Sequence, residues 1–402
     1  MNILQISPQF PFPLSDGGKI SISNLTKALV EQGCSVHCVC LTTIAISRQQ
    51  LQKYESYTGA ICHPILHDTT NSLSAILQSI VDVHTPLYIR KHRSSQIVRH
   101  IENLCKTTSF DAIICDHTAM AEIGLLIAEQ HGIPCILRMH NIEHIIWKRY
   151  AERLAWYDPR SLYVKSQAKK LCNKESEFCM KADYSAMITL HDVDVITALN
   201  HSVKATCIPV GVDLNHFIPQ PTINRIPNRM IHATTYDWIH NTEALDWFIQ
   251  EVLPNVYERH NAELHLYGKH MPDRYASESV PGLKGHGFIE DLNTAYAHAG
   301  IYIAPLFVGG GIRIKILEAM SAGLPVIASP IAAEGIEANR EDGLIRCNNA
   351  TEFVKEISQL IEQPEMAHSL GMKGRAYIAK YHSWESSAQS LIKIITDCRL
   401  IS

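Results

Sequence analysis

The segment that decides the fold runs from Tyr302 to Gly335 and reads YIAPLFVGGGIRIKILEAMSAGLPVIASPIAAEG. It predicts a buried strand at 301–305, a glycine triplet at 309–311, an apolar-periodic helix that holds Glu318, and a second buried strand at 325–329. Glycines before a helix let the backbone approach a ligand closely, and the free N–H groups of the first helical turn attract phosphate. The stretch alone is also compatible with an ordinary strand–helix–strand unit in which the acidic residue is incidental.

Length and composition bound the class of protein. A chain of 402 residues exceeds what one hydrophobic core holds, so it predicts two or three domains. Hydrophobic residues make up 46% of the chain and charged residues 19%, which is typical of a soluble globular protein. Because the net charge is −4, we expect no nucleic-acid partner.

Cysteine spacing and the first residues indicate the compartment. The twelve cysteines include no CxxC pair and no cluster at zinc spacing, which suits thiols in a reducing cytosol. The first ten residues, MNILQISPQF, lack a charged leader, and no apolar run is long enough to span a membrane. We therefore expect a cytoplasmic protein, with peripheral contact to the inner face of the membrane left open.

Short apolar strands alternate with amphipathic helices in the first half of the chain. The predicted elements are strands at 3–7, 35–41, 111–115, 134–139, 182–189 and 204–209 and helices at 19–32 and 120–131. Such alternation predicts a parallel sheet with helices on both of its faces.

The same plan restarts in the second half. The predicted elements there are strands at 230–233, 263–267, 283–286, 300–305 and 325–329 and a helix at 242–256. The proline-rich segment 212–229 lacks periodicity and is interpreted as a linker. The fold class is therefore α/β with two doubly wound parallel-sheet domains, and ligands are expected at the carboxyl ends of the strands. We place an N-terminal domain at 1–217, a C-terminal domain at 218–382 and a last helix at 383–402, which belongs to the second domain or crosses back to the first.

Several motifs follow one another along the chain. They are, in order, SPQFPFPLSDGG, IPVGVDLNHFIP, TTYDWIHNTEALDWFIQEVLP, LYGK, GFIEDL, VGGGIRIKILEAMSAGLPVIAS and YHSWE. In this order and spacing the chain resembles bacterial glycosyltransferases of family 4, which are retaining GT-B enzymes that use sugar nucleotides. The resemblance covers nearly the whole chain. It implies a GT-B fold of two facing Rossmann-like domains, in which the C-terminal domain holds the nucleotide sugar and the N-terminal domain holds the acceptor.

The resemblance assigns a donor-binding role to part of the opening segment. Glu318 matches the second Glu of the family's E-x7-E signature, whose carboxylate binds the ribose hydroxyls through charge-assisted hydrogen bonds. The first signature Glu, which contacts the donor sugar, is replaced here by Gly310. We therefore expect Gly310, Gly311 and Ile312 to meet the donor through backbone groups.

Positive charge is needed where a diphosphate leaves, because negative charge builds on it as the bond breaks. The family's Arg/Lys pair is absent from TTYDWIHNTEAL, so Arg313 and Lys315 are the expected catalytic partners of the diphosphate, although each is equally compatible with a solvated helix charge. Gly17 and Gly18 precede the first helix and offer a second close approach to the phosphates from the opposite domain. The alternative for this pair is a tight turn without a ligand.

Histidines follow two predicted strands of the first domain. His140 follows the strand at 134–139, which places it at the ligand edge of the sheet, and it matches the family's cleft histidine, which contacts the reacting sugar and acceptor. A neutral imidazole there accepts a proton or holds a sugar hydroxyl. His117 ranks second for the same reason of position. Asn141 and Glu143 are weaker companions, and Glu143 alternatively begins the next helix.

Other charged residues have ordinary interpretations. The DVD triplet at 192–194 resembles a metal motif, but it lies at a helix start, where Asp favours capping, so we predict no metal site. Asp237 and Asp291 are likewise expected to cap helices. The segment 148–181 holds nine basic and four acidic residues and is either a solvated helical face or a surface for anionic lipids.

These features together predict a retaining, metal-independent glycosyltransferase of the hexosyltransferase type. It would move a sugar from a nucleotide-diphosphate sugar to a glycan or lipid-linked acceptor in surface polysaccharide assembly, with no cofactor besides the donor substrate. Two alternatives stay open. One is a non-catalytic GT-B pseudo-transferase that binds a glycan or a protein partner, motivated by Gly310. The other is a GT-B epimerase, and the identities of donor and acceptor are not fixed by the sequence.

Overall fold

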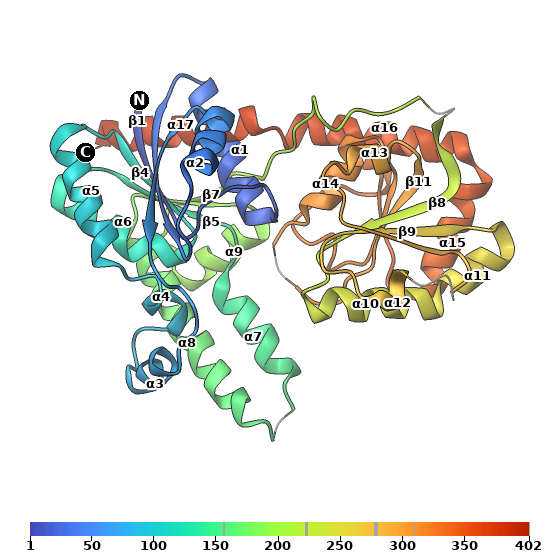
Figure 1. Ribbon diagram of the computed structural model, residues 1–402, viewed down its shortest axis with the longest axis horizontal. Helices are drawn as coiled ribbons and strands as arrows, with labels where there is room; N and C mark the ends of the chain where they lie inside the picture. The colour runs from blue at the N-terminus through green and yellow to red at the C-terminus, as the bar shows by residue number, and fades with distance from the viewer. Residues whose placement is uncertain (156, 222–223, 277–279, 310, 402) are drawn as a thin grey trace. The chain divides into compact units, whose positions relative to one another are not determined.

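The computed structural model describes residues 1–155, 157–221, 224–276, 280–309 and 311–401 (Figure 1). The chain divides into two compact units, the first made of Met1–Gly211 and Trp384–Ser402 and the second of Val212–Ser383. This divide lies a few residues before the boundary indicated by the sequence, and the last helix groups with the first unit.

A parallel sheet of seven strands forms the centre of the first unit, in the order β3-β2-β1-β4-β5-β6-β7. The strands are β1 (Asn2–Ser7), β2 (Ser35–Thr42), β3 (Ile61–Leu66), β4 (Ala112–Asp116), β5 (Cys135–Met139), β6 (Tyr184–Met187) and β7 (Ala205–Cys207). The sequence predicts all of these except β3. That strand lies at the edge of the sheet, where Pro64 is tolerated, and its residues do not alternate clearly between apolar and polar.

Helices cover both faces of this sheet. They are α1 (Gly17–Glu31), α2 (Arg48–Thr58), α3 (Leu73–Val81), α4 (Leu87–Arg90), α5 (Ser95–Thr107), α6 (Ala121–His131), α7 (Glu143–Arg153), α8 (Pro159–Lys181), α9 (Leu190–Leu199) and α17 (Trp384–Ile401). Successive side chains of a strand point to opposite faces. Leu4 and Ile6 of β1 therefore join the core formed with α5, α6, α8 and α9, whereas Gln5 faces α1, where the Thr26 hydroxyl donates to it at 2.6 Å.

The first helix has clear start and stop signals. Asp16 caps its N-terminus, and its carboxylate accepts the Lys19 N–H at 3.0 Å. At the other end Gly33 has a φ of 84°, and the N–H of Cys34 returns to the carbonyl of Leu29 at 3.0 Å. These signals hold the beginning of α1 at the carboxyl end of β1.

Helix α17 is fixed to the first unit at both of its ends. Arg399 forms an ion pair with Asp111 at 2.7 Å, and the Ser387 hydroxyl donates to the Pro209 carbonyl at 2.7 Å. A Cβ built on Gly211 would lie 2.4 Å from the backbone nitrogen of Trp384, so a glycine is required where the two segments meet.

The second unit is built on a parallel sheet of six strands in the order β10-β9-β8-β11-β12-β13. Its strands are β8 (Ile226–Ala233), β9 (Glu263–Tyr267), β10 (Leu283–Gly287), β11 (Ala299–Ala304), β12 (Val326–Ala328) and β13 (Leu344–Arg346). Its helices are α10 (Ile239–Glu251), α11 (Leu253–His260), α12 (Asp273–Ala276), α13 (Asn293–Tyr296), α14 (Ile314–Ser321), α15 (Ala350–Glu362) and α16 (Pro364–Tyr381). Apolar clusters fill both faces of the sheet, one with α10, α11 and α15 and the other with α14. The predicted α/β class with two parallel sheets is confirmed.

Three details of the second unit differ from the prediction. The single helix expected at 242–256 is two helices, because the backbone breaks at Val252 and Pro254 lies in the first turn of α11. The linker expected up to residue 229 ends earlier, since β8 already begins at Ile226. Strand β13 was not predicted because it has three residues and lies at the sheet edge.

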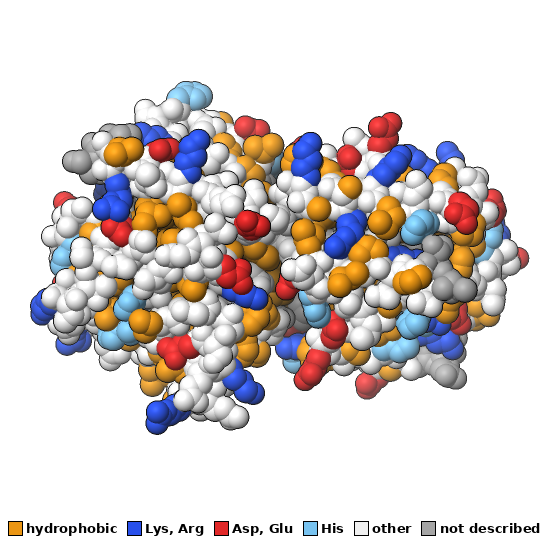
Figure 2. Space-filling view, turned by 90° about the horizontal axis from the view of Figure 1, so that it is seen from above, with side chains coloured by type: hydrophobic (Ala, Val, Ile, Leu, Met, Phe, Trp, Pro, Cys, Tyr) orange, Lys and Arg blue, Asp and Glu red, His pale blue; other side chains and the backbone are white. Residues whose placement is uncertain are grey.

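Charged side chains of both signs are spread over the surface. On the face drawn in Figure 2, Lys and Arg side chains are interspersed with Asp and Glu side chains. That distribution agrees with the small net charge of −4.

Candidate functional site

Two histidines lie where the central strands of the first sheet end. His117 follows β4 and His140 follows β5, and their rings stack with centroids 3.9 Å apart and planes at 25°. Gly17 and Gly18 are the first residues of α1, and a Cβ built on Gly18 would lie 3.8 Å from Nε2 of His117. The structure therefore brings the glycine pair and the two strand-end histidines of the first domain together.

A buried ion pair supports His140. Arg138 of β5 is only 1% exposed, and its guanidinium donates to Oδ1 of Asp116 at 2.8 Å and to the Ser21 hydroxyl of α1 at 2.6 Å. Nε2 of His140 lies 3.1 Å from the same Asp116 oxygen and 2.8 Å from Nη1 of Arg138. Gln5 of β1 donates to the other Asp116 oxygen at 2.6 Å. Three strands and one helix thus fix the orientation of one imidazole ring.

The same network sets the protonation of both histidines. Burial lowers the pKa of His140 most, and the Arg138 charge lowers it further. Asp116 raises this pKa, but by less than the other two effects lower it. Burial, then the nearby His140, lowers the pKa of His117. Burial opposes ionisation of Asp116, yet the His140 hydrogen bond and the Arg138 charge hold the pKa of its carboxyl below the usual value. Neutral imidazoles at pH 7 are able to accept a proton or a hydroxyl hydrogen bond.

His117 has two further features typical of a binding site. Its φ is 64° and its ψ is 150°, an unfavourable backbone conformation for a residue with a side chain. Its Nε2 is buried and has no hydrogen-bond partner among the described residues. A ligand hydroxyl would satisfy this nitrogen, so His117 deserves equal rank with His140 in the candidate site.

Glu175 of α8 is a functional candidate that the sequence did not reveal. It is fully buried and accepts the N–H groups of Glu143 at 2.8 Å and of His144 at 3.2 Å, together with Nδ1 of His144 at 2.6 Å. Its charge therefore lies at the N-terminus of α7, where the helix dipole favours an anion. Burial, then this charge, raises the pKa of Glu143 to about 8, so Glu143 is able to donate a hydrogen bond at neutral pH. Glu143 also begins α7, as the alternative interpretation predicted.

In the second unit, Arg313 organises the glycine loop between β11 and α14. Gly309 has a φ of 151° and Gly311 a φ of 71°, so both lie in the region that favours glycine. A Cβ built on Gly309 would lie 2.2 Å from Nη2 of Arg313, and the same guanidinium donates to the Gly311 carbonyl. Ile312 packs against the apolar cluster beneath α14. Gly310, which replaces the expected acid, lies outside the described residues.

Glu318 is a buried carboxylate of α14. It is 4% exposed, and Nζ of Lys315 donates to its two oxygens at 3.1 and 2.8 Å. Burial first, and then the Glu318 charge, raises the pKa of the phenols of Tyr296 and Tyr302. The structure therefore joins two of the predicted donor-site residues, Lys315 and Glu318, in one ion pair beside the glycine loop.

None of the predicted capping residues is the N-cap of its helix. Asp291 accepts the Asn293 N–H at 2.9 Å just before α13, but it is not the N-cap residue, because Leu292 occupies that position. Asp192 does not cap α9, because Thr189 occupies the N-cap and accepts the Asp192 N–H at 3.0 Å. The prediction that Asp237 caps α10 is also wrong, because the N-cap residue of that helix is Trp238.

Among the described residues, no group of three or more His, Cys, Asp or Glu side chains is arranged to hold a metal ion. Among the described helices, none is both long enough and apolar enough to cross a membrane.

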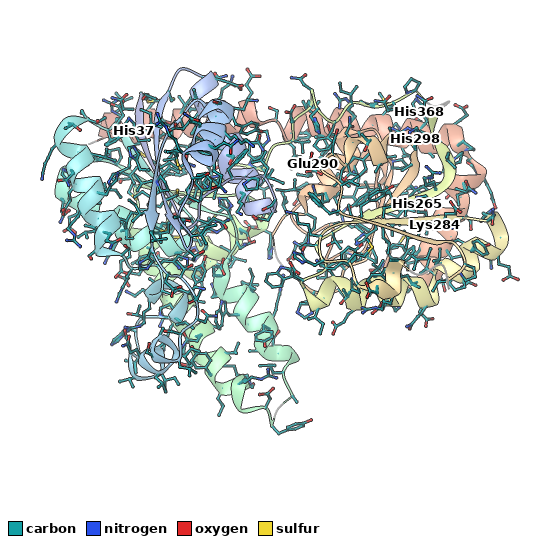
Figure 3. The ribbon with its side chains drawn as sticks, viewed as in Figure 1. His37, His265, Lys284, Glu290, His298 and His368 are labelled. Carbon is teal, nitrogen blue, oxygen red and sulfur yellow. The ribbon has the colours of Figure 1, made fainter. Side chains whose placement is uncertain are left out.

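A separate polar cluster lies on the sheet of the second unit. His265 of β9 is the register partner of Lys284 of β10 (Figure 3). Nε2 of His265 lies 3.1 Å from Glu263, and its Nδ1 lies 2.9 Å from His286. Glu263 is the first residue of β9, so the cluster extends toward the amino end of the strands and away from the edge that holds the glycine loop.

Comparison with known proteins identifies the class of the second unit. Residues 229–363 match the family described as Glycosyl transferases group 1. This range contains the glycine loop, Lys315 and Glu318. The match therefore lies within the second unit.

Relatives and solved structures extend the similarity to the whole chain. An Escherichia coli protein named UDP-Gal:alpha-D-GlcNAc-diphosphoundecaprenol alpha-1,3-galactosyltransferase is 22% identical over 280 residues, which are 64% of this chain and 68% of that protein. Sucrose-phosphate synthase of Thermosynechococcus elongatus aligns over 100% of both chains with a TM-score of 0.71 and 16% identity. Anabaena HepE, solved in complex with UDP and glucose, aligns over 99% of this chain and 100% of its own with a TM-score of 0.67 and 14% identity. The predicted GT-B fold and the recognition of a GT-B glycosyltransferase are confirmed, whereas family 4 in particular stays a prediction.

Proposed function

We propose that this protein transfers a hexosyl group, with retention at the anomeric carbon and without a metal ion, from a nucleotide-diphosphate sugar to a glycan or lipid-linked acceptor. The observation that carries the proposal is the buried Glu318, paired with Lys315 behind a glycine loop in the domain that matches the glycosyltransferase family. Surface polysaccharide assembly is the process that such an acceptor implies.

The donor would bind to the second unit. Ribose hydroxyls would donate to the Glu318 carboxylate in place of Lys315, and the released ammonium would turn to the diphosphate. Backbone groups of Gly311 and Ile312 would meet the sugar or the phosphates, with Arg313 holding the loop in shape and adding positive charge. The positive charge stabilises the diphosphate as the bond from the anomeric carbon to its oxygen breaks.

The acceptor would bind at the strand ends of the first unit. Its hydroxyl oxygen would form the new bond to the anomeric carbon on the face that the diphosphate leaves, and its proton would pass to a diphosphate oxygen. The neutral rings of His140 and His117 would orient hydroxyls of the acceptor sugar. Glu143, protonated near neutral pH, would donate a hydrogen bond to the acceptor.

The names of similar proteins support the choice of substrates. The E. coli relative is named for transfer of galactose from UDP-Gal to a diphosphoundecaprenol-linked sugar, and Anabaena HepE is described in complex with UDP and glucose. A UDP-sugar and a lipid-linked acceptor are therefore the first substrates to test.

Kinetics of two variants tests the proposal. Glu318→Ala removes charge-assisted hydrogen bonds worth about 1.5–3 kcal/mol each, so the donor KM is expected to rise by about 10- to 100-fold. His140→Ala is expected to act mainly on kcat. Glu258→Ala and His201→Ala, which alter exposed residues, serve as matched controls.

Unchanged kinetics in both variants would overturn the assignment of the site. Binding of UDP, GDP or ADP without transfer to any acceptor would favour the non-catalytic alternative. Conversion of a nucleotide sugar in the absence of acceptor would favour the epimerase.

A further inference from the structure

Two loops carry the strand-end histidines of the first unit, and one buried carboxylate contacts both of them. The loop after β4 continues from His117 into the short helical turn η1 (Thr118–Met120), and the loop after β5 continues from His140 into α7. Glu175 of α8 accepts a hydrogen bond from the Thr118 hydroxyl at 3.2 Å, in addition to its contacts at the start of α7. A single side chain from a third element therefore joins the two loops.

All the acceptor positions of this carboxylate are used. Oε1 accepts the Thr118 hydroxyl and the Glu143 N–H, which lies at 2.8 Å. Oε2 contacts the N–H of His144 at 3.2 Å and its Nδ1 at 2.6 Å. A carboxylate has about four lone-pair positions, so these contacts saturate it. Because Glu175 is fully buried, each hydrogen bond that is lost would leave a polar group unpaired in the interior.

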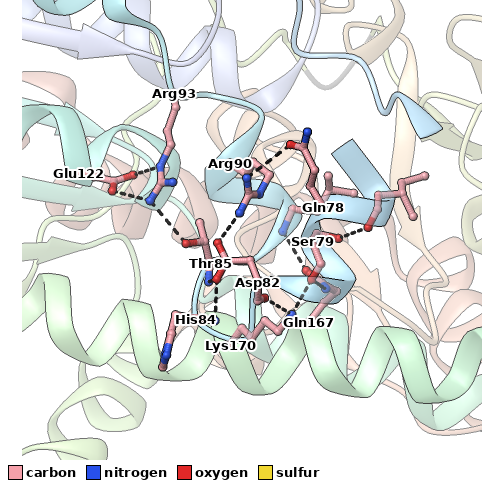
Figure 4. A network of polar contacts seen from close by, with 12 residues as sticks. Gln78, Ser79, Asp82, His84, Thr85, Arg90, Arg93, Glu122, Gln167 and Lys170 are labelled. Carbon is pink, nitrogen blue, oxygen red and sulfur yellow. Dashed lines mark hydrogen bonds and ion pairs between the residues drawn. The ribbon is translucent and has the colours of Figure 1, made fainter. Parts of the chain in front are cut away.

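The helix that carries Glu175 is fixed by a second polar network (Figure 4). Lys170 of α8 is buried, and its ammonium donates to the carbonyls of Ser79 at 2.6 Å and Asp82 at 2.8 Å. The side chain of Gln167, also on α8, accepts the N–H of the first residue of α4 at 2.8 Å. Glu175 therefore projects from a helix that is held in place independently of the two histidine loops.

The contact with Thr118 bears on a strained residue. His117, directly before it, has a φ of 64° and a ψ of 150°, and such a conformation persists only where the surrounding structure holds it. The N–H of His117 donates to the Arg138 carbonyl at 2.9 Å, and the next residue is held through its hydroxyl by Glu175. The His117 ring stacks on His140 with centroids 3.9 Å apart, so the geometry of the stack rests on both contacts.

We propose that Glu175 is a positioning residue, which sets the relative geometry of His117 and His140 without touching substrate. Its hydrogen bonds fix the residue that follows His117 and the first two residues of α7, shortly after His140. The inference rests on the proposed function, in which the two rings orient hydroxyls of the acceptor sugar. It deepens that function by naming a buried residue on which the orientation of both rings depends.

NMR of the full chain with labelled histidines tests the geometry without any substrate. Stacked rings shift each other's proton signals through their ring currents, so the imidazole signals of His117 and His140 report the stack. The two signals are assigned by their absence in His117→Gln and His140→Gln. Glu175→Gln preserves the size of the side chain, but its amide nitrogen donates and cannot accept two of the four hydrogen bonds. We expect this variant to move both signals.

Variants of Thr118 test the same link with a smaller change. Thr118→Val removes one hydroxyl and leaves the contacts between Glu175 and α7 in place, so it is expected to move the two histidine signals as well. Thr118→Ser keeps the hydroxyl and should give the wild-type signals. If Glu175→Gln does not fold, this pair of variants decides the proposal.

Kinetics with a nucleotide sugar and an acceptor gives the second readout. A misplacement on the order of 1 Å costs about 100-fold in rate, so kcat of Glu175→Gln is expected to fall by about 10- to 100-fold. Donor KM should not change, because Glu318 and the glycine loop belong to the other unit. Glu177→Gln is the matched control on the same helix. Its side chain is 35% exposed and pairs with Lys174 and Lys181, so kcat and both histidine signals should stay as in the wild type.

Thermal unfolding shows that each variant is folded at the temperature of measurement. Unchanged histidine signals in Glu175→Gln and Thr118→Val would overturn the proposal, even if stability falls, because Glu175 would then be purely structural. A wild-type kcat in Glu175→Gln, or equal movement of the signals in Glu177→Gln, would overturn it too. A wild type that transfers no sugar would instead overturn the proposed function, and the NMR comparison, which needs no substrate, would still decide the geometry assigned to Glu175.

Discussion

Replacing Arg138 by methionine is expected to remove one partner of the buried network that orients His140. Methionine keeps an unbranched apolar stem but loses the donors to Asp116 at 2.8 Å and Ser21 at 2.6 Å, together with the guanidinium that lies 2.8 Å from Nε2 of His140. Breaking a buried ion pair by removing one partner costs about 3–5 kcal/mol, because the other charge is left uncompensated. The free energy of unfolding of the first unit is therefore expected to fall by that amount.

The same substitution is expected to raise the pKa of His140. Burial and the Arg138 charge both lower that pKa, whereas Asp116 raises it, so removal of Arg138 leaves the raising effect less opposed. The assays are urea denaturation and an NMR titration of the imidazole protons, with the His140 signal assigned by its absence in His140→Gln.

Arg399→Met is the control for this prediction, because it breaks an ion pair in which the arginine side chain is 48% exposed. Surface pairs contribute about 0–1 kcal/mol, so a small effect is expected. Equal losses of stability in the two variants, together with an unshifted His140 titration, would refute the buried network.

Three further predictions concern other parts of the chain. Gly309→Ala strains a backbone with a φ of 151° and displaces the Arg313 guanidinium from the loop, so donor KM is expected to rise at least about tenfold. Gly33→Ala, at a φ of 84° with nothing within 4 Å, should leave donor KM unchanged. Burial lowers the pKa of His232 from 6.5 to about 4, so the unfolded chain binds more protons between these values and stability falls as the pH drops through them. Between about pH 7 and pH 5, the loss of unfolding free energy should be about 2 kcal/mol smaller in His232→Asn than in the wild type, and the same as in the wild type in His298→Asn. Glu175→Gln should lower the pKa of Glu143, the carboxyl at the start of α7. An unchanged Glu143 titration would contradict the charge assigned to Glu175.

Much of the fold follows from local sequence patterns. The central strands are short, continuous apolar runs, because helices cover both faces of each sheet, and such runs are visible without any tertiary information. The edge strands β3 and β13 are less visible, since one is interrupted by Pro64 and the other has three residues. The break between α10 and α11 had a signal in Pro254, which is tolerated only in the first turn of a new helix.

The site was only partly visible in the sequence. Strand ends predicted the position of His140, and helical spacing of three residues is sufficient to pair Lys315 with Glu318. Arg138 was hidden inside an apolar strand, and its partner Asp116 lies on the neighbouring strand, so only the sheet register brings the two charges together. Glu175 lies in a charged helix whose sequence pattern predicts exposure to solvent. The burial of Glu175 depends on how α8 packs against α7, which the sequence pattern does not reveal.

A transfer assay with a panel of UDP-, GDP- and ADP-sugars tests the central claim most directly. The acceptor is a diphosphate-linked lipid sugar, and NMR of the product reports the configuration at the anomeric carbon. The account predicts that one nucleotide sugar is consumed only when acceptor is present, that the product keeps the donor's anomeric configuration, and that Glu318→Ala lowers the rate at limiting donor concentration. A product of inverted configuration, or no binding of any of the three nucleotides, would contradict it.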